Sequence, residues 1–186
     1  MNSKLLTGLF STLLVAGVSL TNAAETGSWG DQGDGTYKNP ILNADYPDVD
    51  IERLGDTYYL ITSTVTYAPG MTVLESKDLV NWQSVGQMWD HLKWEPEYNW
   101  DRMENYGLAV WAADLAYHEG RWYCYFIDTR SGLYVSRADE ITGPWSDPAC
   151  MLKKTGWTDP AAFWDEEEKQ AYLVCNFGRD HGKDPG

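Results

Sequence analysis

A segment that occurs twice in the chain limits the folds open to it more strongly than any other feature of the sequence. Gly55-Asp-Thr-Tyr-Tyr-Leu60 returns 65 positions later as Gly120-Arg-Trp-Tyr-Cys-Tyr125, and a weaker copy surrounds Gln170 to Leu173. A second motif, from Ser76 to Trp82, is echoed between Ser136 and Trp145. Each copy is typical of a hairpin, a further strand and a polar turn that ends in tryptophan. Such repeats predict the blades of a β-propeller, and a sandwich of similar hairpins is the alternative.

The segments between turn signals have the length and composition of β-strands. They are short, rich in Tyr, Ile, Val and Leu, and bounded by Gly and Asp. No segment beyond residue 24 sustains the period of an amphipathic helix. We therefore predict an all-β fold with strands within residues 58–62, 71–74, 122–127, 132–135 and 171–175.

The number of repeats is too small for a closed propeller. At about 50 to 65 residues per unit, the chain supplies about two and a half to three blades, whereas closure needs at least about four. No closing element follows the last predicted strand. We expect the chain to be the N-terminal part of a longer protein.

The first residues have the layout of a secretory signal peptide. Lys4 precedes an apolar stretch from Leu5 to Leu20, and small residues follow up to Ala24. A membrane anchor is the alternative, but the stretch is interrupted by Thr, Gly and Ser, and a spanning helix needs about 20 apolar residues. We predict a signal peptide over residues 1–23, a solvated lead-in over 24–37 and a truncated propeller domain over 38–186. The protein is then secreted or periplasmic.

The composition favours a carbohydrate ligand. A formal net charge of −14 repels phosphates and anionic lipids, so nucleic acids and membrane surfaces are poor partners. Ten Trp and twelve Tyr accompany 28 acidic residues. Aromatic faces can meet the C–H faces of sugar rings, and carboxylates accept hydrogen bonds from sugar hydroxyls. A role of the aromatics in the core alone is the alternative.

Several common kinds of site have no matching motif. The sequence contains no G-x-S-x-G elbow, no P-loop and no zinc-like spacing of Cys and His. Cys124, Cys150 and Cys175 are an odd number for an exported chain, so at most one disulfide can form among them. Carboxylates are therefore the groups that could carry chemistry.

Three aspartates stand where a turn leads into an apolar run. Asp48, Asp114 and Asp159 occupy this place in successive units. In a propeller the innermost strands converge on the axis, so carboxylates at their beginnings can point into an axial pocket, where unequal surroundings separate their pKa values. Side chains that only form turns are the alternative. For Asp45 and Asp50 we expect turn and strand-edge roles.

Short motifs follow one another in a fixed order: Asn39-Pro-Ile-Leu, Asp45-Tyr-Pro-Asp48, Gly55-Asp-Thr-Tyr-Tyr-Leu, Ser76-Lys-Asp-Leu-Val-Asn-Trp82, Val110-Trp-Ala-Ala-Asp-Leu, His118-Glu-Gly-Arg-Trp-Tyr, Ile141-Thr-Gly-Pro-Trp and Trp157-Thr-Asp159-Pro-Ala. Together they resemble glycoside hydrolase family 43 over nearly all of the chain that follows the predicted signal peptide. The resemblance implies a five-bladed β-propeller. It also implies an inverting β-xylosidase, α-L-arabinofuranosidase or arabinanase.

The resemblance assigns roles to four side chains. Asp48, in the Tyr-Pro-Asp motif, corresponds to the general base, and Asp159 to the carboxylate that orients the acid and tunes its pKa. Trp111 corresponds to the tryptophan that lines the sugar subsite. Tyr67 corresponds to an aromatic wall. The family often has Pro-Asp-Pro and Trp-Ala-Pro-Asp where this chain has Pro-Asp-Val and Trp-Ala-Ala-Asp, which removes backbone restraint but no functional group.

The third carboxylate of the family is missing from its expected place. The family's general acid is a glutamate in a later blade, whereas Glu166, Glu167 and Glu168 follow Asp159 closely and are typical of a solvated turn. We expect the acid to lie beyond Gly186 and the chain alone to be inactive. The resemblance requires no cofactor or catalytic metal and allows for a structural cation near the axis.

These observations predict a glycosidase that removes terminal pentose residues from polysaccharides or oligosaccharides of the xylan or arabinan type. A carbohydrate-binding propeller without turnover is the alternative. The segment from Trp89 to Tyr106 also contains Trp94, Tyr98 and Trp100 among acidic residues. We expect it to form a rim loop whose aromatics select the substrate.

Overall fold

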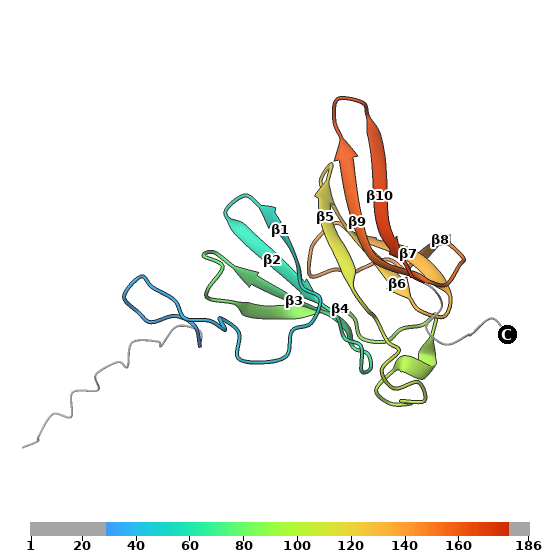
Figure 1. The fold of residues 1–186 in the computed structure, drawn as a ribbon, viewed down its shortest axis with the longest axis horizontal. Helices are drawn as coiled ribbons and strands as arrows, with labels where there is room; N and C mark the ends of the chain where they lie inside the picture. The colour runs from blue at the N-terminus through green and yellow to red at the C-terminus, as the bar shows by residue number, and fades with distance from the viewer. Residues whose placement is uncertain (1–28, 179–186) are drawn as a thin grey trace, which may run out of the picture.

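The computed structural model describes residues 29–178, which form three antiparallel sheets (Figure 1). The first sheet has the order β1-β2-β3-β4, the second β5-β6-β7-β8, and the third contains only β9 and β10. The predicted strands all lie within observed ones, and residues 29–178 contain no α-helix, only one 3₁₀ turn. The bounds are β1 Asp50–Leu54, β2 Thr57–Thr62, β3 Gly70–Ser76, β4 Gln83–Trp89, η1 Pro96–Tyr98, β5 Ala113–His118, β6 Arg121–Asp128, β7 Gly132–Ala138, β8 Ala149–Leu152, β9 Trp157–Asp165 and β10 Gln170–Phe177.

Each sheet is one propeller unit, so the described residues comprise two four-stranded blades and the first two strands of a third. The prediction of two and a half to three blades is confirmed, and the sandwich alternative is wrong. No helix among residues 29–178 is long and apolar enough to cross a membrane. The predicted signal peptide, residues 1–23, lies outside the described residues.

The repeated sequence motifs correspond to repeated turns. Gly55 and Gly120 lie in the two-residue turns that join the first two strands of each complete blade, with φ of 64° and 79°. Such turns need positive φ, which glycine adopts without strain. The repeated tryptophans close the turn after the third strand, since Trp82 Nε1 donates to Leu79 O and Trp145 Nε1 donates to Ile141 O, both at 3.0 Å.

The first two blades share one hydrophobic core. Ile61 and Val73 of the first blade and Leu115 and Phe126 of the second are at most 2% exposed and belong to one cluster. Burying a side chain of this kind stabilises the fold by about 1.5–3 kcal/mol. Cys124 is also buried in this core, whereas Cys150 is exposed and Cys175 half-buried, and all three cysteines are free thiols.

The predicted rim loop is wrong in part. Trp89 ends β4, and Trp89 and Tyr98 are buried in the core, 7% and 1% exposed. The segment folds back because the Asn99 side chain accepts from Leu92 N at 2.7 Å and donates to Leu92 O. Trp100 and Tyr106 remain exposed, so only part of this segment faces solvent.

The innermost strands of the three blades are joined by a repeated carboxylate contact. Asp50 of β1 accepts from Leu115 N of β5 at 2.7 Å, and Asp114 of β5 accepts from Ala162 N of β9 at 3.1 Å. Each aspartate lies four residues before the end of its strand. The equivalent position in β9 is occupied by Ala161. We call these contacts the inter-blade ties. The strand-edge role expected for Asp50 and the turn alternative for Asp114 are replaced by this structural role.

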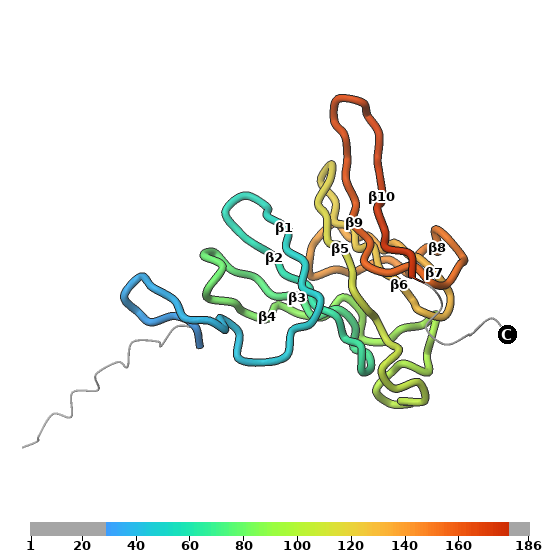
Figure 2. The backbone as a smooth tube through the Cα atoms, viewed as in Figure 1, coloured from blue at the N-terminus to red at the C-terminus, as the bar shows by residue number. Residues whose placement is uncertain are grey.

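The innermost strands run in one direction, which determines where their beginnings lie. The arrows of β1, β5 and β9 point to the same side in Figure 1, and Figure 2 shows the hairpin turns that follow them on that side. The strand beginnings therefore lie together at the opposite end. The described part of the lead-in forms a small hairpin, in which Asp31 bridges to Tyr37 and accepts from Asn81 Nδ2 at 2.9 Å.

Candidate active site

Asp48 lies two residues before β1, the first innermost strand, and residues at the end of β2 fix its position. Ser63 Oγ donates to Asp48 Oδ2 at 2.8 Å. On the preceding residue, Pro47 O accepts from Ser63 N at 3.1 Å and from Thr62 Oγ1 at 2.6 Å. Asp48 has φ of 49°, an uncommon value for a side chain larger than glycine. The segment is thus held in a strained conformation by the neighbouring strand, a pattern that is concentrated at functional sites.

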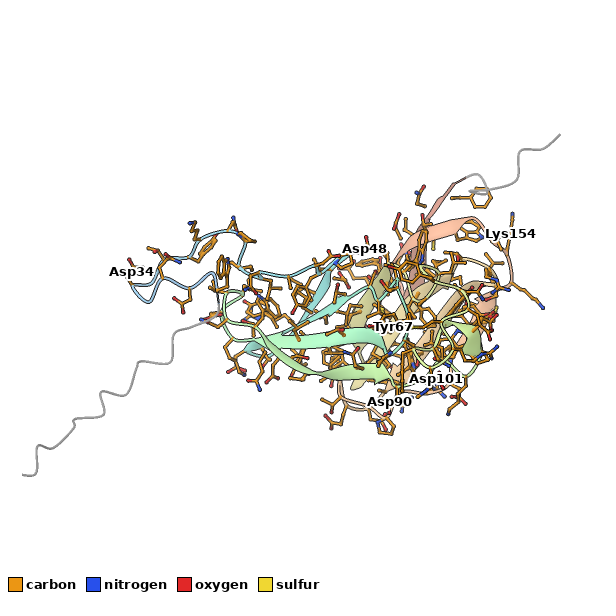
Figure 3. The ribbon with its side chains drawn as sticks, turned by 90° about the horizontal axis from the view of Figure 1, so that it is seen from below. Asp34, Asp48, Tyr67, Asp90, Asp101 and Lys154 are labelled. Atoms are coloured by element: carbon orange, nitrogen blue, oxygen red, sulfur yellow. The ribbon has the colours of Figure 1, made fainter. Side chains whose placement is uncertain are left out.

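A groove opens beside Pro47 and Ser63, the two residues that contact Asp48, and Tyr67 contributes an exposed face to it. The groove has a volume of about 440 Å³, within the range of small-molecule sites. Tyr67 is 41% exposed, and Figure 3 shows it between Asp48 and the pair Asp90 and Asp101 in that view. The lining residues are Asp45, Pro47, Ser63, Thr64, Val65, Thr66, Tyr67, Pro69 and Gln87. Asp45, for which we expected a turn role, therefore also lines the groove.

The segment before β5 brings Trp111 toward the same region. Thr64 N donates to Val110 O and Ala109 N donates to Val65 O, both at 3.1 Å. These bonds tie the groove wall to the residues that precede Trp111. The Trp111 indole is half-buried and donates to Gly107 O at 3.3 Å, so the plane of the ring is fixed by its own loop.

Asp159 is the third residue of β9, at the beginning of the third innermost strand. Its φ is 53°, close to that of Asp48, and its side chain is exposed. Asp159 Oδ2 accepts from Thr158 Oγ1 at 3.1 Å. Burial and, to a smaller extent, the negative charge of Asp159 raise the pKa of the Cys175 thiol.

Asp48, Trp111 and Asp159 therefore lie at the beginnings of β1, β5 and β9, at one end of the propeller axis. The sequence pattern predicts this place for Asp48 and Asp159, and for Asp114 rather than Trp111. Asp114 is different, because its carboxylate is engaged in an inter-blade tie. Burial is the main cause that raises the pKa of Asp114 to about 6. The hydrogen bond from Ala162 N lowers this pKa, and the negative charges of Asp50 and Glu52 raise it further.

A model of the glycosyl hydrolases family 43 matches residues 37–185. The chain belongs to this family. It is 62% identical over 154 residues to a beta-xylosidase of Formosa agariphila, covering 82% of the chain and 26% of that protein. It is 39% identical over 118 residues to a non-reducing end alpha-L-arabinofuranosidase of Bacteroides ovatus, covering 61% of the chain and 22% of that protein.

Solved structures confirm the fold of this family 43 chain. The xylan beta-1,4-xylosidase of Bacillus halodurans superimposes with a TM-score of 0.59 at 29% identity, over 80% of the chain and 29% of that structure. The related structures are five-bladed β-propellers, so the chain forms part of such a propeller. It spans about a quarter of the length of the curated relatives it matches.

The three glutamates that follow Asp159 lie in a turn, as the sequence predicts. Glu166, Glu167 and Glu168 lie in the turn between β9 and β10, where the backbone N–H groups of Glu167 and Glu168 donate to Asp165 Oδ1 at 2.9 Å. This turn is at the far end of β9 from Asp159. Within residues 29–178, no group of three or more His, Cys, Asp or Glu side chains could hold a metal ion.

Ser63 is the residue of this site that the sequence did not reveal. It stands in the run Thr62-Ser63-Thr64, which resembles an ordinary strand end. Its contact with Asp48 joins residues 15 positions apart and depends on the register of β1 with β2. Only a Ser or Thr directly after β2, together with the expected pairing of these strands, could have indicated it.

Proposed function

We propose that the full-length protein to which this chain belongs is an inverting glycosidase. It removes terminal pentose residues from oligosaccharides or polysaccharides of the xylan or arabinan type. Membership of family 43 and the likeness to a beta-xylosidase and an alpha-L-arabinofuranosidase support this proposal. The predicted signal peptide supports a secreted or periplasmic location.

The observation that carries the proposal is the position of Asp48. Asp48 is exposed to solvent next to Pro47, which lines an open groove, and one of its carboxylate oxygens accepts from the buried hydroxyl group of Ser63. A general base must be both accessible to water and held at a defined angle, because proton transfer depends on hydrogen-bond geometry. Asp48 meets both requirements.

The proposed reaction is a single displacement at the anomeric carbon. Asp48 takes a proton from a water molecule, which attacks the face of the sugar opposite the leaving group. Asp159 orients the acid and raises its pKa by its negative charge, and a glutamate from the rest of the protein donates a proton to the leaving oxygen. The base and acid carboxyl groups of inverting enzymes stand about 6.5–9.5 Å apart, which leaves room for this water.

Trp111 and Tyr67 are the proposed sugar-binding side chains. Trp111 is fixed by its indole hydrogen bond, and Tyr67 presents an exposed ring in the groove wall. Flat aromatic faces of this kind can pack against the apolar C–H faces of a pyranose or furanose ring. Neither residue distinguishes xylose from arabinose by its chemistry.

Hydrolysis of an aryl β-xyloside and an aryl α-L-arabinofuranoside tests the proposal. We expect the full-length protein to turn over at least one of them and the 186-residue chain to turn over neither, because the acid is supplied from elsewhere. Turnover by the 186-residue chain would show that the acid lies within it. Sugar binding by the full-length protein without any turnover would support a carbohydrate-binding propeller instead.

A further inference from the structure

We propose that Ser63 is a positioning residue for Asp48, which orients the carboxylate for proton transfer. The inference rests on the proposed function, since it concerns the base of that reaction. Ser63 Oγ lies 2.8 Å from Asp48 Oδ2 and is the donor, because an ionised carboxylate can only accept. A hydrogen bond to a charged acceptor is stronger than one between neutral groups, so it can hold one orientation.

The hydrogen bond from Ser63 gives the two carboxylate oxygens of Asp48 different roles. Ser63 donates to Oδ2, and Oδ1 is then the oxygen that can accept a proton from a water molecule. Without the serine hydroxyl, the carboxylate could rotate about its last torsion, which is broad and roughly two-fold for aspartate. The bond therefore selects one oxygen as the base.

The burial of Ser63 makes it a rigid donor. Ser63 is 5% exposed although it borders the groove, whereas Asp48 is exposed. Ser63 N also donates to Pro47 O, and Thr62 Oγ1 donates to the same oxygen. The end of β2 thus holds both the backbone before Asp48 and the side chain of Asp48, which favours the left-handed backbone of Asp48 over its relaxed alternatives.

Three variants of Ser63 in the full-length enzyme isolate the effect of the hydroxyl group. Ser63→Ala removes the hydroxyl group. Ser63→Thr and Ser63→Val introduce side chains of the same shape as each other, but only threonine keeps the hydroxyl donor. We expect Ser63→Ala and Ser63→Val to lower kcat by about 10- to 100-fold, since misplacing a catalytic group by about 1 Å costs up to this much. KM should change by less than about two-fold, and Ser63→Thr should recover most of the kcat that Ser63→Val loses.

A double variant separates positioning from stability. In an Asp48→Asn background, Ser63→Ala should cause no further loss of kcat, because the base that it positions is already gone. The matched control is Ser136→Ala. Ser136 is 1% exposed and its hydroxyl donates to Ser146 O at 2.7 Å in the second blade, so its loss should lower thermal stability but leave kcat unchanged.

The outcomes distinguish this inference from the proposed function. Full activity of Asp48→Asn would overturn the role of Asp48 as the base and the role of Ser63 with it. Loss of activity in Asp48→Asn with wild-type kcat in Ser63→Ala would overturn the positioning role alone. Equal kcat in Ser63→Thr and Ser63→Val, or a further loss of the same size in the Asp48→Asn background, would also overturn it.

Discussion

The beginnings of the first and third blades contain the same kind of residue in different surroundings. Asp48 and Asp159 both have φ near 50°, both are exposed and both stand beside a proline. The carboxylate of Asp48 accepts from the hydroxyl group of Ser63, which follows β2 and is 15 residues away, whereas that of Asp159 accepts from the adjacent Thr158. The first contact depends on the pairing of β1 with β2, and the second is local.

This difference shows which part of the site is formed by the described residues alone. The first blade supplies a carboxylate with a fixed orientation, consistent with a base that acts on a small water molecule. The third blade, of which residues 29–178 include two strands, supplies a carboxylate whose environment is less determined. We expect Asp159 to acquire its function from groups outside the described residues, among them the acid that it orients.

The largest effect should come from the fixed carboxylate. Asp48→Asn keeps the acceptor for Ser63 but cannot take up a proton, so kcat/KM of the full-length enzyme should fall by about 10²- to 10⁴-fold. Steady-state kinetics on the better of the two aryl glycosides measures this. A fall of less than about tenfold would place the base elsewhere.

A smaller effect should come from the locally held carboxylate. Asp159→Asn removes a negative charge near the acid, and kcat should fall by roughly 10- to 100-fold as the acid loses its orientation. Because a nearby negative charge raises the pKa of a carboxylic acid, the variant should lose activity at a lower pH than the native enzyme. An unchanged pH profile of kcat/KM would contradict the assigned role.

Substitutions in the inter-blade ties test whether the blade that positions Asp48 depends on its contact with the next blade. Asp50→Ala leaves Leu115 N without its acceptor, and we expect the free energy of unfolding to fall by about 1–3 kcal/mol. Thermal unfolding measures this. The control is Asp56→Ala, which removes an exposed ion pair with Lys77 and a hydrogen bond from Thr57 Oγ1 and should change stability little. Equal effects of the two substitutions would show that the tie contributes nothing.

The second tie should show the smallest effect, and the effect should depend on pH. Burial raises the pKa of Asp114 from 3.8 to about 6. The folded state therefore binds the proton more tightly, so the contribution of Asp114 to stability is greatest below pH 4 and is lost as pH rises through 6. Asp114→Asn should thus be more stable than the native protein at pH 8, by about 1 kcal/mol after solvent screening, and similar to it at pH 4. Chemical unfolding at the two pH values measures this, and a native protein that is the more stable at pH 8 would contradict it.

The sequence predicts the repeating parts of this molecule better than the contacts between them. Strands such as β2 and β6 could be predicted because their apolar residues follow a glycine turn that recurs in each unit. The burial of Trp89 and Tyr98 could not, because a loop rich in aromatic and acidic residues gives no periodic signal when it folds back on the core. Asp48 and Asp159 could be singled out by their place before or within a strand. Ser63 and the two ties could not, since each joins distant residues through a register or a blade contact that only the structure shows.

The most direct test of the central claim is rescue of a variant that lacks the base. Asp48→Gly keeps the backbone, because glycine adopts the positive φ of this position without strain, and removes the carboxylate. We predict that the full-length variant hydrolyses aryl glycosides poorly, and that added azide, a nucleophile that needs no deprotonation, restores turnover to a glycosyl azide of inverted configuration. Undiminished hydrolysis without azide, or a product of retained configuration, would contradict the assignment of Asp48 as the general base.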